Sequence, residues 1–476
     1  MLVVMIAAIF VGFPISFTLL FLAFAFGWWG LGDMVFSLAY FQSVGLMKES
    51  LLAAVPLFIF MGFVAEQAGL MERLFGALRL LLAPLRGSLF VVVILTSAAF
   101  AMATGIVGAA VTVLGIMAAP MMMRSGYDGK LSAGAITAGG TLGILIPPSV
   151  MLIVMGPVLG VSVADLYAAA IVPGFMLAGM YVVYVLVRSY FNPRLGPALP
   201  MEERAPSVWV ALRGFLAGVV PLAGLVAATL GSILAGMATP TEAAGMGAAG
   251  ALVLALAYRR LTWAGFQRAL LQSLATSSMV LVLALTSNIF GAVFARLGAA
   301  DWITDSLLAL PLPPALMLAL VTVLIFLLGW PFEWPAVILV FLPIFYPVVS
   351  ELGVDLVWFG ALVAVTLQTA YLSPPVAMSA YYLKQVAKGW SLRTIYRGMF
   401  EFMGIQVVAI ALIFLFPAIA TWLPQRLFDS GALVVSEPVP AASSPSQGYG
   451  ESYEQMYQRQ LEALPASSDK EKRPPG

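Results

Sequence analysis

Apolar stretches long enough to cross a lipid bilayer recur along this sequence from residue 1 to about residue 423. A spanning helix needs about 18 or more consecutive apolar residues, and these stretches reach that length. Hydrophobic residues make up 62% of the chain and charged residues 9%, whereas a soluble domain has about a quarter charged residues. The pattern excludes a soluble globular fold for most of the chain and predicts an all-α polytopic membrane protein.

The first apolar stretch, Met1 to Trp29, lacks the basic flank and the small-residue cleavage site of a signal peptide, so we expect it to be a spanning helix. Further stretches of membrane length follow it. The expected spans are 2–29, 50–69, 131–160, 167–188, 214–234, 237–258, 270–295, 354–384 and 399–423.

Two other apolar blocks, 88–123 and 312–350, are interrupted near their middles by helix-breaking residues. The interruptions are 103–108 and 329–335, and each block is too short for two comfortable crossings plus a loop. Backbone without helical hydrogen bonds survives at membrane depth only where protein or a water-filled cavity surrounds it. We therefore predict two re-entrant helical hairpins.

The chain also carries an internal repeat. Shifting the sequence by 227 residues brings distinctive residues of the two halves into register. The coincident pairs are Pro84 with Pro311, Pro120 with Pro347, Gly126 with Gly353, Asp128 with Asp355, and Pro147-Pro148 with Pro374-Pro375. Such self-similarity predicts two copies of one structural unit.

Charge distribution predicts that the two copies are inverted. With a cytoplasmic N-terminus and nine crossings, most of the 23 Lys and Arg residues fall on the cytoplasmic side, as the positive-inside rule requires. The hairpins then enter from opposite sides, which is typical of secondary transporters. The expected parts are a first repeat (1–190), a cytoplasmic linker (191–213), a second repeat (214–425) and a polar tail expected to be disordered (426–476).

The composition also excludes several kinds of catalytic and metal-binding site. The chain has no cysteine and no histidine, so it lacks thiolates, disulfides and the commonest general base and metal ligand. A net charge of +1 indicates no nucleic-acid partner, and no P-loop is present to bind ATP. We expect no catalytic residue, no resident metal and no cofactor, and transport must therefore draw on an ion gradient.

Two segments are predicted to break inside apolar stretches, at 139–149 (GGTLGILIPPS) and 368–375 (QTAYLSPP). Proline lacks a backbone donor and clashes with the preceding turn, so carbonyl groups are freed. A bound cation or water would satisfy them, and a hard cation such as sodium prefers oxygen ligands. We predict one ion site per repeat, where a hairpin tip meets a break, with the substrate between them. The competing interpretation is a pair of packing kinks.

Three acidic residues deserve separate interpretations. Glu333 lies in the second hairpin tip, where an intramembrane carboxylate is a functional candidate. Glu242 follows Thr239 and Pro240, which is typical of a helix N-terminus. Glu66 lies near the end of a span, and we expect it to be interfacial. Short amphipathic segments at 71–82 and 300–310 are expected to lie along the membrane surface.

Three segments, 139–149, 238–245 (ATPTEAAG) and 367–383 (LQTAYLSPPVAMSAYYL), resemble the hallmark motifs of the large permease, or M, subunit of tripartite ATP-independent periplasmic (TRAP) transporters, the DctM-like family. The resemblance covers about residues 1–425. It implies an elevator-type ion transporter fold in a bacterial inner membrane and sodium-coupled uptake of an organic acid. It also implies two partners, a four-helix small permease and a periplasmic substrate-binding protein.

The family's functional positions can be carried onto this chain where the motifs match. Sodium is then expected at Thr104, Gly105, Gly108, Gly140, Thr141, Gly143, Pro147, Gly329, Glu333, Thr369, Ser373 and Pro374. Substrate is expected at Thr104, Ser149, Glu333, Ser373 and Ser379.

The first tip departs from the serine-rich pattern of many members, and the second carries Trp330-Pro331. These departures favour a smaller or more apolar acid over a heavily hydroxylated sugar acid. Alternatives are a stand-alone divalent-anion/sodium symporter, an integral-membrane enzyme and a scaffold subunit.

Overall fold

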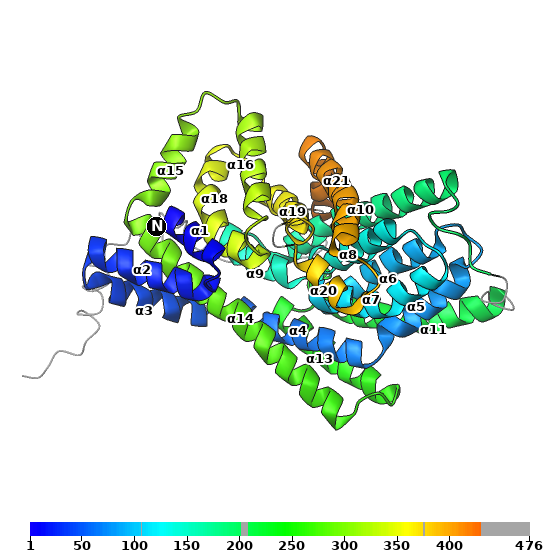
Figure 1. Cartoon of the computed structure of the whole chain (residues 1–476). Coiled ribbons are helices and arrows are strands. Elements are labelled where there is room, and N and C mark those ends of the chain that lie inside the picture. Colours follow the sequence, from blue (N-terminus) through cyan, green and yellow to red (C-terminus); the bar gives the residue numbers. More distant parts are fainter. Residues whose placement is uncertain (106, 201–207, 375–376, 430–476) are drawn as a thin grey trace, which may run out of the picture. The chain divides into compact units, whose positions relative to one another are not determined.

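The computed structural model describes residues 1–429 except 106, 201–207 and 375–376, and this part of the chain is built from helices (Figure 1). Of the polar tail predicted at 426–476, residues 430–476 lie outside the described residues. The first half contains α1 (Leu2–Val11), α2 (Ile15–Leu31), α3 (Met34–Met47), α4 (Ala54–Gln67), α5 (Leu70–Leu82), α6 (Ser88–Thr104), α7 (Val107–Arg124), α8 (Gly129–Leu145), α9 (Val150–Leu159) and α10 (Val163–Phe191).

The second half repeats this order with small differences. It contains α11 (Val208–Val226), α12 (Ser232–Leu234), α13 (Pro240–Ala257), α14 (Trp263–Arg296), α15 (Ala299–Leu308), α16 (Pro314–Leu328), α17 (Trp334–Ala336), α18 (Leu342–Glu351), α19 (Leu356–Leu367), α20 (Met378–Val386), α21 (Leu392–Leu415) and α22 (Ala418–Pro424). Short 3-10 or π turns, η1 (Ser50–Ala53), η3 (Ala227–Gly231), η4 (Val337–Phe341), η5 (Gln368–Tyr371) and η6 (Gln425–Asp429), join or extend some of them.

Eight helices in the described ranges are long and apolar enough to cross a membrane, and a ninth span is formed if α8 and α9 count as one broken helix. This confirms the predicted all-α polytopic membrane protein. The sides of the membrane on which the loops lie, and hence the inversion of the repeats, stay a prediction.

The prediction of one spanning helix from Met1 to Trp29 is wrong. The chain leaves α1 at Gly12, which adopts a left-handed φ of 106°, and α2 starts after Pro14 in extended conformation. Gly12 ends the first helix and Pro14 cannot continue its hydrogen-bond ladder. The expected span 399–423 is likewise divided, because α21 ends before Phe416 and Pro417. The helix α3 was not predicted.

The repeat seen in the sequence is matched by local structure. Each hairpin is preceded by a short helix that starts after a left-handed glycine, Gly69 before α5 and Gly298 before α15. Each hairpin is followed by an aspartate that caps the next helix: Asp128 accepts from the Leu131 N–H at 2.9 Å, and Asp355 accepts from the Val357 N–H at 2.8 Å. The same capping chemistry therefore starts α8 and α19.

The two halves differ in one long element. Helix α14 runs unbroken for 34 residues, about 51 Å at about 1.5 Å per residue. The corresponding segment of the first half is divided into α3 and α4, with Lys48, Glu49 and η1 between them. Helix α4 packs against both α13 and α14, and α14 also packs against α2 and α3 (Figure 1).

Helix α8 is the centre of a second group of helices. All of its residues from Leu131 to Leu145 are buried. It packs against α6, α7 and α21 (Figure 1). A Cβ placed on Gly398 of α21 would lie 2.0 Å from the Lys130 carbonyl oxygen and 2.8 Å from the Gly134 nitrogen of α8. Glycine therefore permits two backbones to touch at this crossing, as small residues do in membrane helix pairs.

Candidate functional site

The first helix break lies between α8 and α9, which meet at an angle of 46°. Pro147 and Pro148 occupy the break and supply no backbone N–H. The Ser149 hydroxyl donates to the Ile144 carbonyl across the break, and Tyr167 donates to the Ser149 carbonyl at 3.4 Å. The predicted break is thus present, and hydroxyls of the protein satisfy two of its carbonyl groups.

The second break follows the 3-10 turn Gln368–Tyr371 and precedes α20. Thr369 donates to the Thr366 carbonyl at 2.7 Å, and Ser373 donates to the Thr369 carbonyl at 2.8 Å. Both side chains are buried. Pro374 is half-buried at the break, while Pro375 lies outside the described residues. The chain therefore departs from helical geometry at both predicted positions.

Each hairpin tip lies against the break of its own repeat. A Cβ placed on Gly105 would lie 3.7 Å from the Val150 nitrogen and 3.9 Å from the Gly143 carbonyl oxygen. In the second repeat, a Cβ on Gly329 would lie 3.3 Å from the Ala370 side chain. The structure therefore brings Gly105 to Gly143 and Gly329 to the turn that holds Thr369. The Thr104 side chain lies outside the part that the structure describes.

The hydroxyls near the breaks point back to their own helices. Thr141 donates to the Ala138 carbonyl at 2.9 Å, in the same manner as Thr369 and Ser373. A hydroxyl that donates its one proton keeps its oxygen lone pairs free. These oxygens can still face a cation, because hard cations bind neutral oxygen ligands.

Two predicted site positions, Gly140 and Gly108, have close packing neighbours, and Glu242 has the capping role expected of it. Gly140 faces α7, where a Cβ would lie 2.3 Å from a Val111 methyl and 3.3 Å from its nitrogen. Glu242 forms a capping box with Thr239, accepting from the Thr239 N–H at 2.8 Å, which agrees with the helix-start interpretation. Gly108 lies under the Tyr382 ring of α20, whose atoms would be 3.0 to 3.3 Å from an added Cβ.

Glu333 stands immediately before α17 in the second tip. Its carbonyl accepts from the Ala336 and Val337 N–H groups, but its side chain makes no capping hydrogen bond. Within the described ranges its carboxylate has no ion pair. The carboxylate lies within electrostatic range of Tyr371 and Tyr382. A half-buried carboxylate without a basic partner is costly as an anion, so either a proton or a bound cation neutralises it.

Tyr382 is a site residue that the sequence analysis missed. It contacts Gly108 of the first tip and lies within electrostatic range of Glu333 in the second. Ser379 is three residues earlier, on the same face of α20, and its buried hydroxyl has no partner within the described part. Tyr381 next to it is 45% exposed. Helical spacing from Ser379 is the signal that could have identified Tyr382 in the sequence.

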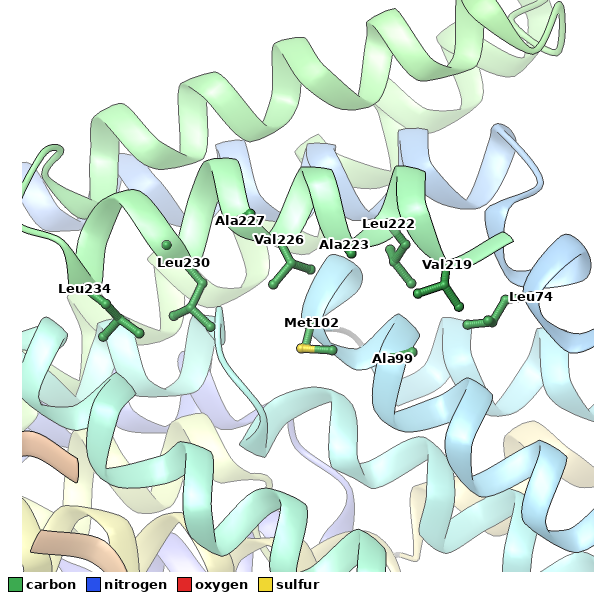
Figure 2. A pocket seen from close by; sticks show the side chains of 11 residues that line it. Leu74, Ala99, Met102, Val219, Leu222, Ala223, Val226, Ala227, Leu230 and Leu234 are labelled. Atoms are coloured by element: carbon green, nitrogen blue, oxygen red, sulfur yellow. The ribbon is translucent and has the colours of Figure 1, made fainter. Parts of the chain in front are cut away.

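A separate cavity of about 360 Å³ lies beside the first hairpin (Figure 2). Figure 2 shows Val219, Val226 and Leu230 pointing toward Ala99 and Met102 of α6. Its lining residues are Leu74, Ala99, Met102, Val219, Leu222, Ala223, Val226, Ala227, Leu230, Gly231 and Leu234, all apolar. The described residues that line the cavity offer no polar side chain to an ion or a carboxylate, so we place the candidate site at the helix breaks.

Two helix breaks, each contacted by a hairpin tip inside a polytopic helical protein, define the class of secondary membrane transporters. Residues 2–419 match the family model described as "Tripartite ATP-independent periplasmic transporter, DctM component". The chain therefore belongs to the family of DctM components of tripartite ATP-independent periplasmic transporters.

Individual relatives agree with this assignment. The chain is 29% identical to the sialic acid TRAP transporter large permease SiaM of Vibrio cholerae, covering 89% of this chain and 97% of the relative. It is 30% identical to the C4-dicarboxylate TRAP transporter large permease DctM of Pseudomonas aeruginosa, covering 79% and 86%. Its fold is similar to the crystal structure of the Alcanivorax borkumensis YdaH transporter, with a TM-score of 0.58, 17% identity and 83% and 90% of the two chains covered.

Proposed function

We propose that this chain is the large membrane subunit of a sodium-coupled TRAP transporter that takes up an organic acid across a bacterial inner membrane. The observation that carries the proposal is the pairing of each hairpin tip with a broken helix, Gly105 with Gly143 and Gly329 with Ala370. Broken helices at matched positions of two repeats are where secondary transporters hold their ions and substrate.

Sodium as the coupling ion is supported by the chemistry of these breaks. The side chains there offer hydroxyl oxygens, from Thr141, Thr369 and Ser373, and one unpaired carboxylate, from Glu333. Oxygen donors suit a hard cation, and the sequence has no histidine or cysteine to bind a softer one.

An organic acid as the substrate is supported by the relatives, whose names specify sialic acid and C4-dicarboxylates. The space between the two breaks adds Ser379, with an unpartnered hydroxyl, and the Tyr382 ring. The first-turn N–H groups of α7 start at the first tip and favour an anion. Thr104, Ser149, Glu333 and Ser373 complete the proposed substrate positions.

In an elevator mechanism the two hairpins and the broken helices move together against a scaffold. Helices α6, α7, α8, α20 and α21 pack on one another, which suits such a mobile unit, and α4, α13 and α14 form the other packed group. As in the family, a small four-helix permease and a periplasmic binding protein would supply the remaining parts.

The test is transport by the purified chain in liposomes. With its small permease and its binding protein present, and with an inward sodium gradient imposed, a labelled organic acid should accumulate. Dissipating the sodium gradient should abolish the accumulation. Equal uptake without the binding protein would instead identify a stand-alone symporter, and uptake without any ion gradient would contradict the proposal.

We expect Tyr382→Phe to raise the KM for the acid by about tenfold, as loss of one hydrogen bond to a charged group predicts. The maximal rate should change less, because the ring that covers Gly108 is kept. Uptake measured against acid concentration at saturating sodium checks this. Tyr381→Phe is the matched control, since Tyr381 is on the same helix and exposed. Equal KM values for both variants would remove Tyr382 from the substrate site.

A further inference from the structure

Four exposed arginines from both halves of the chain lie at one corner of the group formed by α4, α13 and α14. This arginine corner consists of Arg73 near the start of α5, Arg259 and Arg260 in the turn after α13, and Arg268 in α14. In the part of the chain that the structure describes, none of the four forms an ion pair with a carboxylate. Clustered positive charge without carboxylate partners attracts an anion.

Side-chain contacts bring these three segments together. The Arg73 guanidinium lies 3.9 Å from the centre of the Tyr258 ring, and Tyr258 directly precedes the two arginines of the turn. A Cβ placed on Gly265 would lie 3.2 Å from the side-chain oxygen of Gln67, so α14 starts beside the end of α4. Arg268 is one helical turn further along α14. The start of α5, the turn and the first turns of α14 therefore share one surface.

The turn that carries Arg259 and Arg260 is held by backbone hydrogen bonds. The Arg260 N–H donates to the Ala255 carbonyl at 3.0 Å, and the Arg259 N–H donates to the Leu256 carbonyl at 2.9 Å. This pattern is the Schellman ending of a helix, and Arg259 has the left-handed φ of 54° that the motif requires. Glycine is the usual residue at that position, so the turn geometry does not account for an arginine there.

The surface next to the arginine corner is apolar and faces outward. Val253 and Leu256 of α13 are exposed, and so are Leu271 and Leu274 of α14. Trp263, at the start of α14, is 74% exposed. Exposed apolar side chains on spanning helices face acyl chains, whereas tryptophan is enriched at the level of the lipid headgroups. The corner therefore lies where a helix surface passes from acyl chains to headgroups.

Two carboxylates near the corner reduce its charge without cancelling it. Glu72 directly precedes Arg73 in α5, and Glu66 lies within electrostatic range of Glu72. The sequence from Ala243 to Ala300, which includes the turn and α14, contains no acidic residue. Four arginines thus face two carboxylates, and the positive charge is concentrated on the side of the turn.

We propose that the arginine corner binds the phosphate group of an anionic phospholipid, whose acyl chains lie along the exposed faces of α13 and α14. A guanidinium ion presents paired N–H donors that match phosphate oxygens, and all four basic residues of the corner are arginine, not lysine. The charge distribution of the sequence predicts that this end of the helices is cytoplasmic, where anionic lipids make the membrane surface negative. The proposal does not depend on the coupling ion or on the transported acid.

Lipid binding can be measured without transport. Native mass spectrometry of the purified full chain, freed of lipid in detergent, gives its affinities for phosphatidylglycerol and for phosphatidylcholine with the same acyl chains. An arginine near an anionic membrane surface contributes roughly fivefold in affinity. Arg259→Gln with Arg260→Gln should therefore weaken phosphatidylglycerol binding by about tenfold or more and leave phosphatidylcholine binding unchanged. Unchanged phosphatidylglycerol binding would overturn the proposal.

Two further double variants separate a site from general attraction to charge. Arg259→Lys with Arg260→Lys keeps the charge and should retain most of the preference for phosphatidylglycerol. Arg393→Gln with Arg397→Gln removes the same charge from two exposed arginines at the start of α21 and should change the affinity by less than about twofold. Equal losses in the two glutamine variants would indicate diffuse attraction and would overturn a site at the corner.

Two competition measurements decide whether a lipid occupies the corner. Inorganic phosphate should not displace phosphatidylglycerol, because it lacks the acyl chains that lie on α13 and α14. Displacement by phosphate alone would identify a soluble anion and would overturn the lipid assignment. Loss of phosphatidylglycerol binding when the small permease is added would show that a protein covers the corner, and would overturn it too.

Discussion

Glu333→Gln is expected to raise the sodium concentration for half-maximal uptake by about tenfold or more, because a buried charged pair contributes about 1.5–3 kcal/mol. The carboxylate stands in the second hairpin tip without a capping hydrogen bond, and the described part of the chain gives it no ion pair. A cation is then its natural partner. Glutamine keeps the shape of the side chain and removes the charge.

The same variant separates an ion role from a substrate role. An anionic side chain repels an anionic substrate, so removing its charge should leave the KM for the acid unchanged or lower it at saturating sodium. Uptake measured over a grid of sodium and acid concentrations distinguishes the two constants. Glu351→Gln, an exposed position at the far end of the same hairpin, is the matched control. Unchanged sodium dependence in Glu333→Gln would remove Glu333 from the ion site.

Gly398→Ala is expected to destabilise the protein. The new methyl would lie 2.0 Å from the Lys130 carbonyl oxygen and 2.8 Å from the Gly134 nitrogen. Both neighbours are backbone atoms of α8, so no side-chain rotation relieves the clash. Overpacking typically costs about 1–3 kcal/mol, which corresponds to a fall in melting temperature of about 1–3 °C for a chain of this length. Thermal unfolding of the purified complex measures it.

Gly404→Ala is the matched control on the same helix. Nothing lies within 4 Å of the Cβ position at Gly404. Alanine favours a helix over glycine by up to about 1 kcal/mol, so this variant should be neutral or slightly more stable. If Gly398→Ala behaved in the same way, α8 and α21 would not touch as described.

Most of what could be predicted about the site came from the positions of proline and glycine residues in the sequence. The internal repeat aligns Pro147-Pro148 with Pro374-Pro375, which predicted one helix break in each half. Both breaks are present. The same reasoning failed at the N-terminus, where Pro14 follows Gly12 and divides the first expected span. Tyr382 was missed because its role depends on contacts with residues far away in the chain, Gly108 and Glu333.

The sequence by itself determined that this chain is a helical membrane protein with two copies of one unit. The length of a segment, its apolar character and the backbone chemistry of its residues are local properties. A helix that crosses lipid and a proline that interrupts it can therefore be predicted from the sequence of the segment alone. Only the tertiary structure decided that Gly140 serves packing against Val111, and that Tyr382 of α20 covers Gly108 of the first tip. Those relations come from helices that pack at close range, and the geometry of packing is not encoded in any single segment.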